Sequence, residues 1–180
     1  MSPFEQAFAV VVDHEGPGDR DPNDPGNWTG GRVGSGTLGG TRFGISTAAY
    51  PTIDVMSLSL ADAQAIYRRD YWDAVDGDAL PPPLALLVFD AAVNAGVRAA
   101  GQWLQLATGA TVDGKIGPLT RAAVAAAVAR EGGAAVCAEF QARRTVFMAG
   151  LPTWSHFGLG WARRLCVLPY QSLRMTTGVA

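Results

Sequence analysis

The residues best suited to chemistry lie close together near the N-terminus of the 180-residue chain. Residues 10–31 read VVVDHEGPGDRDPNDPGNWTGG, so an apolar segment runs directly into a polar loop. Four carboxyl groups in this segment are candidates for acid or base roles: Glu15, Asp19, Asp21 and Asp24. Glycoside cleavage needs one carboxyl group to protonate the leaving oxygen and a second to activate a water or attack the sugar. The segment is therefore a candidate glycosidase site.

Glu15 is the candidate proton donor because of its position on a predicted helix that starts near Pro3 and stops before Gly16. Phe4, Phe8 and Val11 precede it at helical spacing, so Glu15 extends their apolar face. Apolar surroundings would raise the pKa of this carboxyl group and let it donate a proton near neutrality. Position alone favours the alternative, a helix-end carboxylate wetted by solvent.

The same loop partly resembles a calcium-binding loop, because Asp19, Asp21 and Asn23 alternate as metal ligands do. Pro22 interrupts that pattern, and Gly30 stands where a bidentate Glu is required. We therefore predict no metal site here, and we expect no cofactor.

The elements that must position these residues are mostly helical. Residues 17–44 are rich in Gly, Pro, Asp, Asn and Thr, which predicts a long irregular loop with a β-hairpin within residues 31–46. Ser59 and Asp62 form a capping-box pattern at the start of a helix that we expect to reach Trp72. Further helices are predicted over residues 81–95, 97–109, 119–130, 133–149 and 157–167.

Composition and termini set the broad class. Apolar residues make up 48% and charged residues 17% of the chain, which is typical of a globular protein. We find no apolar run of membrane-spanning length and no signal-peptide pattern, so we expect synthesis in the cytoplasm. Cys137 and Cys166 lie in apolar helical surroundings and are predicted to be buried free thiols.

Charge is distributed unevenly along the chain. Residues 1–97 carry five arginines against thirteen acidic residues, a balance of −8, whereas residues 98–180 carry nine basic residues against three acidic ones, a balance of +6. The basic half could dock on an anionic polymer. The alternative is ordinary solvated surface charge.

Several blocks of sequence, in order, resemble the glycoside hydrolase family 108 muramidases, which include phage endolysins and secretion-associated peptidoglycan hydrolases. The blocks are HEG, DPNDPGN, GTRFGIS, AIYRRDYW, FDAAVNAG, DGKIGPLT and FGLGWARR, and they are spread over nearly the whole chain. The resemblance implies a mainly α fold: a lysozyme-like α+β catalytic region with a small β-hairpin over residues 1–97, then a helical peptidoglycan-binding-like region over residues 98–180.

The resemblance also assigns catalytic roles. Glu15 matches the family's glutamate and would be the general acid, although Pro17 stands where the family has a second glycine. Asp24, nine positions after Glu15, has a spacing similar to the carboxylate pair of phage T4-type lysozymes. Thr41, in GTRFGI, matches the family's threonine, and Asp24 and Thr41 would hold the attacking water in an inverting reaction.

Two choices stay open at this stage. Asp21 is the reserve second carboxylate, because loop geometry could place either aspartate at the site. Residues 27–39, NWTGGRVGSGTLG, look like an insertion before Thr41, and Thr29 within them would fit the uninserted spacing about as well.

Weaker candidates lie further along the chain. Tyr71 could stack on a sugar ring, whereas Trp72 is expected to pack in the core. Asp90 and Asn94 could bind the acetamido groups of a substrate, or they could form a buried polar pair that fixes helix orientation. The aromatic residues of the last helix, Trp154, His156, Phe157 and Trp161, are predicted to form a core seam rather than a binding face.

The function predicted from these observations is an N-acetylmuramidase that cleaves the β-1,4 bond between N-acetylmuramic acid and N-acetylglucosamine. A non-catalytic peptidoglycan-binding module and a lytic transglycosylase, which needs no second carboxylate, are the alternatives. The predicted partner is the glycan strand of peptidoglycan, with no nucleic acid and no stable membrane insertion, and we expect a monomer. Release to the wall or periplasm would need a holin, a secretion system or lysis.

Overall fold

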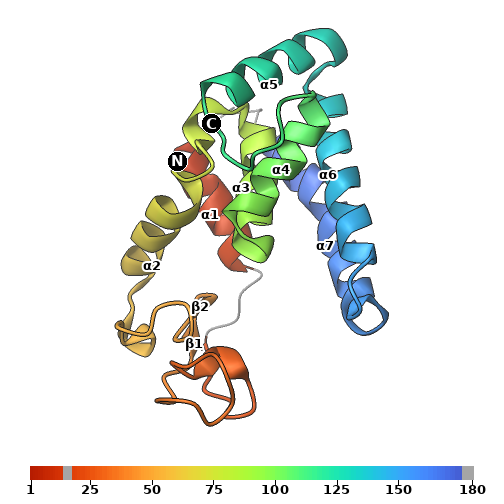
Figure 1. Ribbon diagram of the computed structural model, residues 1–180. Helices are drawn as coiled ribbons and strands as arrows, with labels where there is room; N and C mark the ends of the chain where they lie inside the picture. Colours follow the sequence, from red (N-terminus) through yellow and green to blue (C-terminus); the bar gives the residue numbers. More distant parts are fainter. Residues whose placement is uncertain (14–17, 176–180) are drawn as a thin grey trace. The chain divides into compact units, whose positions relative to one another are not determined.

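The computed structural model describes residues 1–13 and 18–175. Within these residues it contains seven α-helices, several short 3-10 and π turns, and one two-stranded antiparallel sheet (Figure 1). The helices are α1 (Pro3–Asp13), α2 (Leu60–Tyr67), α3 (Pro82–Ala95), α4 (Val97–Thr108), α5 (Pro118–Glu131), α6 (Gly133–Ala149) and α7 (Trp154–Arg174); the strands are β1 (Thr41–Arg42) and β2 (Ile45–Ser46). The predicted mainly α class with a small hairpin is confirmed.

The chain forms two compact units. One comprises Phe8–Arg68 and is called the loop unit; the other combines Met1–Ala7 with the chain from Arg69 onward and is called the helical unit. The helical unit contains both α3 and α4, which pack against each other. The predicted boundary near residue 97 therefore does not coincide with a boundary between compact units, and the assignment of separate roles to residues 1–97 and 98–180 stays a prediction.

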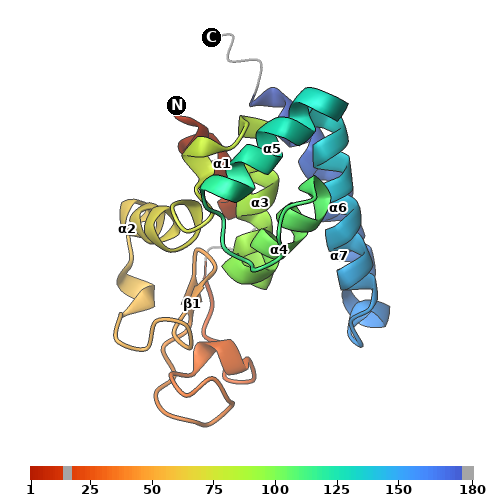
Figure 2. The same ribbon diagram turned by 45° about the horizontal axis from the view of Figure 1, so that its top comes forward.

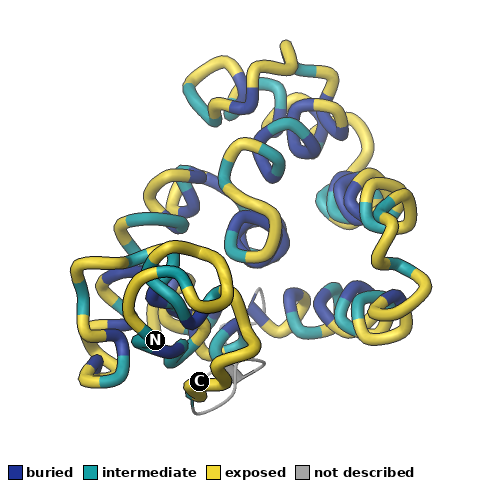
Figure 3. The backbone as a smooth tube through the Cα atoms, turned by 60° about the horizontal axis from the view of Figure 1, so that its bottom comes forward, coloured by how far each residue is buried: buried dark blue, intermediate teal, exposed yellow. Residues whose placement is uncertain are grey.

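Helix α3 forms the centre of the helical unit. It contacts α4, α6 and α7, and residues 84–92 along it are all buried. A helix that is apolar around its whole circumference requires neighbours on every side. In Figures 1 and 2, α6 and α7 run side by side as a hairpin. Along the other helices, buried and exposed residues alternate in the way amphipathic helices require (Figure 3).

Local sequence signals explain several helix ends. Ser59 and Asp62 form the predicted capping box of α2, Pro118 occupies the first position of α5, and Gly109, with φ 72°, ends α4. The helix predicted to reach Trp72 is α-helical only to Tyr67, and a π turn (Arg68–Trp72) follows.

Helix α7 is longer than predicted. The sequence predicts a helix over residues 157–167. Pro169 removes a backbone donor and normally ends or kinks a helix. The structure continues α7 through Pro169 to Arg174. Leu165, Leu168 and Ser172 lie at helical spacing and are buried, and burial of this stripe offsets the cost of the proline, about 3 kcal/mol.

Other expectations concern cysteines and membranes. Both cysteines are free thiols; Cys137 is half-buried, but Cys166 is exposed, so its predicted burial is wrong. Its position on α7 faces away from the buried stripe of that helix. None of the described helices is long and apolar enough to cross a membrane.

Candidate active site

The amide side chain of Asn27 organises the polar part of the loop unit. Asn27 ends the 3-10 turn η1 (Pro25–Asn27) and is completely buried. Its Nδ2 donates to Oδ1 of Asp19 at 2.9 Å and to the carbonyl of Asp21 at 3.1 Å. Its Oδ1 accepts a hydrogen bond from the hydroxyl of Thr41 at 2.7 Å. One buried amide therefore joins three segments of the loop.

Backbone pairing holds Asp19 beside Thr41. The amide of each residue donates to the carbonyl of the other, both at 2.9 Å, which forms an isolated antiparallel bridge. Gly18 precedes this bridge with φ 110°, and a Cβ there would lie 2.9 Å from the carbonyl oxygen of Thr41. Glycine is therefore required for the close approach of the two chains.

The hydroxyl of Thr41 is a hydrogen-bond donor within the loop. A threonine hydroxyl carries one proton, and that proton is donated to Asn27. The lone pairs on the oxygen remain able to accept a hydrogen bond from a water molecule. Thr41 is only partly buried.

Asp24 lies at the start of the same turn. Its Oδ1 accepts from the amide of Gly26 at 2.8 Å and so caps η1, and its side chain is exposed. Among the described residues, no partner is found for its Oδ2. The backbone carbonyl of Asp24 accepts from the amide of Asn27 at 3.1 Å. The turn thus connects the predicted base to the amide that holds Thr41.

Asp21 is also exposed, and its Oδ1 accepts two hydrogen bonds from Asn23, both at 2.9 Å. Asp19, likewise exposed, accepts from the amide of Asp21 at 2.5 Å in addition to Asn27. Within the described residues, no group of His, Cys, Asp or Glu side chains could hold a metal ion.

Thr29 has a different local role from Thr41. Its amide donates to the carbonyl of Thr37 at 3.0 Å, and its hydroxyl accepts from the amide of Thr37 at 2.9 Å. Trp28 and Leu38 form a further bridge beside this pair. Thr29 therefore pairs the two ends of the predicted insertion through Thr37. Thr41 is the threonine that is hydrogen-bonded to Asn27 and Asp19.

The turn that follows Thr41 is strained and is secured by a tyrosine. Phe43 and Gly44 connect β1 and β2, and both have positive φ, 52° and 72°. A two-residue hairpin turn demands this backbone, which a bulky residue such as Phe43 rarely adopts. The hydroxyl of Tyr67 donates to the carbonyl of Phe43 at 2.9 Å, and the Tyr67 ring packs against Phe8 at 5.5 Å.

The stripe that leads to Glu15 is present in α1. Phe4, Phe8 and Val11 are all at least 95% buried, as the sequence predicted. Glu15 itself lies outside the described residues, so its predicted role stays a prediction.

The three predicted substrate-binding residues lie in the helical unit. Tyr71, in the π turn after α2, is half-buried. Its neighbour Trp72 is fully buried, as expected, and donates to Asp78 at 2.9 Å. Asn94 is exposed, and its Nδ2 donates to the backbone carbonyl of Asp90 at 2.7 Å.

Asp90 is fully buried in an ion-pair network. Its Oδ2 accepts from Arg144 of α6 at 2.6 Å, and its Oδ1 accepts from Arg164 of α7 at 2.5 Å. Burial lowers the pKa of Arg144, and the negative charge of Asp90 opposes that shift. This arrangement favours the second sequence-based alternative for Asp90, a buried group that fixes helix orientation, over contact with a sugar.

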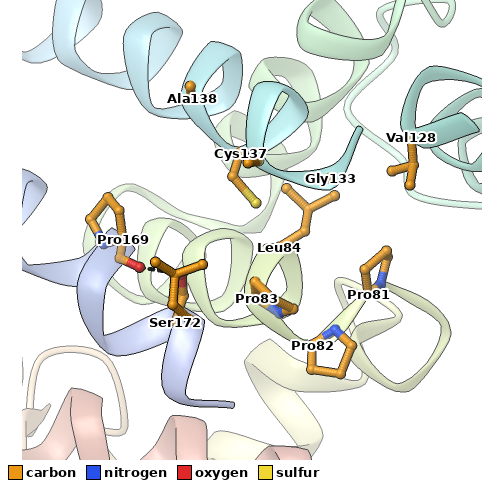
Figure 4. A pocket seen from close by; sticks show the side chains of 12 residues that line it. Pro81, Pro82, Pro83, Leu84, Val128, Gly133, Cys137, Ala138, Pro169 and Ser172 are labelled. Atoms are coloured by element: carbon orange, nitrogen blue, oxygen red, sulfur yellow. Dashed lines mark hydrogen bonds between the residues drawn. The ribbon is translucent and has the colours of Figure 1, made fainter. Parts of the chain in front are cut away.

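A cavity of the helical unit is unsuited to this chemistry. It has a volume of about 440 Å³ and lies between the start of α3, the start of α6 and the end of α7 (Figure 4). Prolines, Leu84 and Val128 line it, and its one titratable group is the thiol of Cys137, whose pKa burial raises to about 11. No carboxyl group lines this cavity, so it cannot supply an acid–base pair.

Sequence reasoning missed Asn27. In the sequence, Asp19 is only one of several nearby carboxylates, and Asn27 lies in a segment that looks like an insertion. The available signal was the turn sequence DPGN, in which an asparagine can bond to nearby backbone. Nothing in the sequence predicts that this side chain is completely buried.

The family model of glycosyl hydrolase 108 matches residues 8–96. The chain is also similar to the solved structure of SagA from Brucella abortus, with 30% sequence identity and a TM-score of 0.79 over 98% of this chain and 97% of that chain. No curated protein sequence matches the chain.

The chain belongs to glycosyl hydrolase family 108 and is a glycoside hydrolase.

Proposed function

We propose that the protein is an N-acetylmuramidase that hydrolyses the β-1,4 bond between N-acetylmuramic acid and N-acetylglucosamine with inversion at the anomeric carbon. The observation that carries the proposal is the network in which buried Asn27 holds the hydroxyl of Thr41 beside Asp19, within the segment that matches the family. An inverting glycosidase needs such a polar, water-accessible wall to hold the attacking water.

In this proposal, Glu15 protonates the leaving oxygen. In the sequence, Glu15 follows the apolar stripe of α1. Apolar surroundings favour the protonated form of a carboxyl group, which is the form that a general acid needs. The role itself comes from the family's glutamate, which Glu15 matches.

Asp24 and Thr41 act on the water. The exposed carboxylate of Asp24 accepts one proton of the water while the lone pairs of Thr41 accept a hydrogen bond from the other. The oxygen of the water is then directed toward the anomeric carbon, and Asp24 takes up the proton as the bond forms. Asn27 fixes the orientation of the Thr41 hydroxyl.

Digestion of purified peptidoglycan tests the reaction. We expect products with reducing N-acetylmuramic acid ends, which mass spectrometry distinguishes from anhydro ends by the mass of one water. Anhydro products would instead assign the protein as a lytic transglycosylase. Binding to peptidoglycan without any new ends would assign it as a non-catalytic module.

Separate substitutions of the loop aspartates test the choice of base. Asp24→Asn should abolish activity, Asp21→Asn should leave it near wild type, and Asp19→Asn should reduce it by disturbing Asn27. Loss of activity in Asp19→Asn together with full activity in Asp24→Asn would transfer the role of base to Asp19. Circular dichroism of each variant checks that the fold is retained.

We also propose that the protein acts as a monomer on the glycan strands of the cell wall, with bacteriolytic activity as the outcome. Reaching that substrate requires release through a holin, a secretion system or lysis. Addition of the purified protein to the outside of cells whose wall has been made accessible should therefore cause lysis.

A further inference from the structure

Trp28 directly follows η1 and has no role in the catalytic proposal. It is half-buried, and its indole Nε1 donates to the backbone carbonyl of Pro22 at 2.8 Å. An indole carries a single polar group, its N–H, and in Trp28 that group is used to hold the backbone of the loop. The held carbonyl lies two residues before Asp24, the proposed base.

Asp24 lies at the junction of two consecutive turns. In the first turn, the amide of Asp24 donates to the carbonyl of Asp21 at 3.2 Å. Pro22 occupies the second position of this β-turn, which proline favours. In the second turn, η1, the carbonyl of Asp24 accepts from the amide of Asn27 at 3.1 Å. The direction of the Asp24 side chain therefore depends on the angle between the two turns.

Trp28 is hydrogen-bonded to both turns. Its backbone amide donates to the carbonyl of Pro25 at 3.3 Å in the second turn, whereas its indole reaches the carbonyl of Pro22 in the first. Asn27 makes a similar connection, because its buried amide group donates to the carbonyl of Asp21. Two successive side chains thus bind two successive carbonyls of the first turn and fix that turn against the second.

The predicted insertion holds Trp28 itself. Trp28 forms an isolated antiparallel bridge with Leu38, and its carbonyl accepts from the amide of Gly31 at 2.8 Å. The next residue, Thr29, pairs with Thr37. The backbone on which the indole is mounted is therefore ordered by hydrogen bonds within residues 27–39.

We propose that Trp28 is a positioning residue for the reaction, because its indole holds the turn that aims the Asp24 carboxylate at the attacking water. The inference rests on the proposed function for the role of Asp24. Among the described residues, only the amide of Gly26 donates to this exposed carboxylate, so its direction depends on the backbone below it. A displacement of about 1 Å at a reacting group can lower a rate by a large factor.

The substitution Trp28→Phe tests the proposal, because Phe keeps an aromatic ring but cannot donate to Pro22. Rates are referred to the folded fraction measured by circular dichroism. We expect the rate at saturating peptidoglycan to fall about three- to tenfold with the apparent KM near wild type, since Trp28 acts through Asp24 and not on the sugar. In nuclear magnetic resonance spectra, the Gly26 amide, which donates to Asp24, should shift and exchange faster with solvent.

Two other tryptophans supply controls. Trp72→Phe removes an indole hydrogen bond of similar length, 2.9 Å to Asp78, within the helical unit. Trp161 is half-buried like Trp28, and its indole N–H has no hydrogen-bond partner among the described residues. Trp161 and Phe157, which is 51% exposed, do not form the core seam that the sequence predicts for α7. Both Trp72→Phe and Trp161→Phe should keep the wild-type rate per folded molecule and the wild-type Gly26 amide.

An unchanged Gly26 amide in Trp28→Phe would overturn the proposal, because the Asp24 carboxylate would not have moved. A changed amide with a wild-type rate would also overturn it where Asp24→Asn is inactive. An equal fall in rate in Trp72→Phe would do the same, since loss of any indole hydrogen bond would then suffice.

Two further outcomes are separate from the rate of the variant. In the wild-type protein, the indole N–H of Trp28 should exchange with solvent more slowly than that of free tryptophan, and exchange at the free rate would overturn the proposal even if Trp28→Phe does not fold. Full activity in Asp24→Asn would contradict the proposed base. A changed Gly26 amide in Trp28→Phe would then still support the hold of Trp28 on Asp24.

Discussion

At the scale of single residues, the buried amide of Asn27 determines the geometry of the candidate site. It donates to Asp19 and accepts from Thr41, so its loss leaves two polar side chains without their partner. The buried amide makes three hydrogen bonds, and each contributes about 0.5–1.5 kcal/mol net to stability. Loss of Asn27 should also lower activity, because the Thr41 hydroxyl would no longer be held in the orientation proposed for binding the attacking water.

Asn27→Ala should therefore lower the rate of reducing-end release from peptidoglycan by at least about tenfold and lower the free energy of unfolding by about 1–3 kcal/mol. Asn23→Ala is the control, because Asn23 is an exposed asparagine of the same loop that bonds only to Asp21 in the described structure. Wild-type activity in Asn27→Ala would show that the network has no catalytic role.

The two cysteines should differ in reactivity. Burial raises the pKa of the Cys137 thiol to about 11, so little of it is the reactive thiolate at pH 8, whereas Cys166 is exposed. We expect alkylation of the native protein to label Cys166 rapidly and Cys137 slowly, with both labelled rapidly in denaturant. Variants that retain only one cysteine assign each rate, and equal rates in the native protein would contradict the described burial.

At the scale of elements, the β1–β2 hairpin depends on Tyr67. The positive φ of Phe43 costs conformational energy, and the hydrogen bond from Tyr67 to the Phe43 carbonyl holds the turn in place. Tyr67→Phe removes that bond and should lower the free energy of unfolding by about 0.5–1.5 kcal/mol, with some loss of activity because Thr41 begins β1. Urea denaturation measures the change.

The control for that substitution is Tyr170→Phe, which changes a tyrosine that is 74% exposed on α7. It should leave both stability and activity unchanged. If Tyr67→Phe behaves in the same way, the turn does not depend on the hydroxyl.

The capping box of α2 should respond to acid. Hydrogen bonds from Ser59 lower the pKa of Asp62 in the folded protein. A carboxyl group with a lowered folded pKa stabilises the protein above its unfolded pKa of about 3.9, and that contribution is lost as pH falls through the folded value. The difference in stability between wild type and Asp62→Asn should thus be present at pH 6 and shrink toward pH 2. A difference that grows on acidification would contradict the assignment.

Elements with local signals were predictable from the sequence, and those set by tertiary packing were not. The capping box at Ser59 and the proline start of α5 depend on neighbouring residues alone. The continuation of α7 through Pro169 depends on burial of Leu165 and Leu168, which no local pattern reveals. For the site, turn composition predicted a polar loop with Asp24 and Thr41, but the burial of Asn27 depends on the fold of the whole loop.

At the scale of the whole molecule, the buried ion-pair network ties α3 to α6 and α7. Asp90 accepts from both Arg144 and Arg164, and it is completely buried. Asp90→Ala leaves buried positive charge without its partner, so it should lower the free energy of unfolding by about 3–5 kcal/mol. Glu139→Ala, which breaks the exposed pair with Arg143, should cost only about 0.3–0.5 kcal/mol. Equal costs in urea denaturation would contradict the structural role of Asp90.

The central claim for the molecule is that this family 108 glycoside hydrolase cleaves peptidoglycan with Glu15 as its general acid. The most direct test is the rate of reducing-end release from purified peptidoglycan by Glu15→Gln, with Glu5→Gln, an exposed glutamate in the first turn of α1, as the control. The account predicts a loss of about 10²–10⁴-fold for Glu15→Gln, with no change in thermal unfolding and full activity for the control. Wild-type activity in a folded Glu15→Gln variant would contradict it.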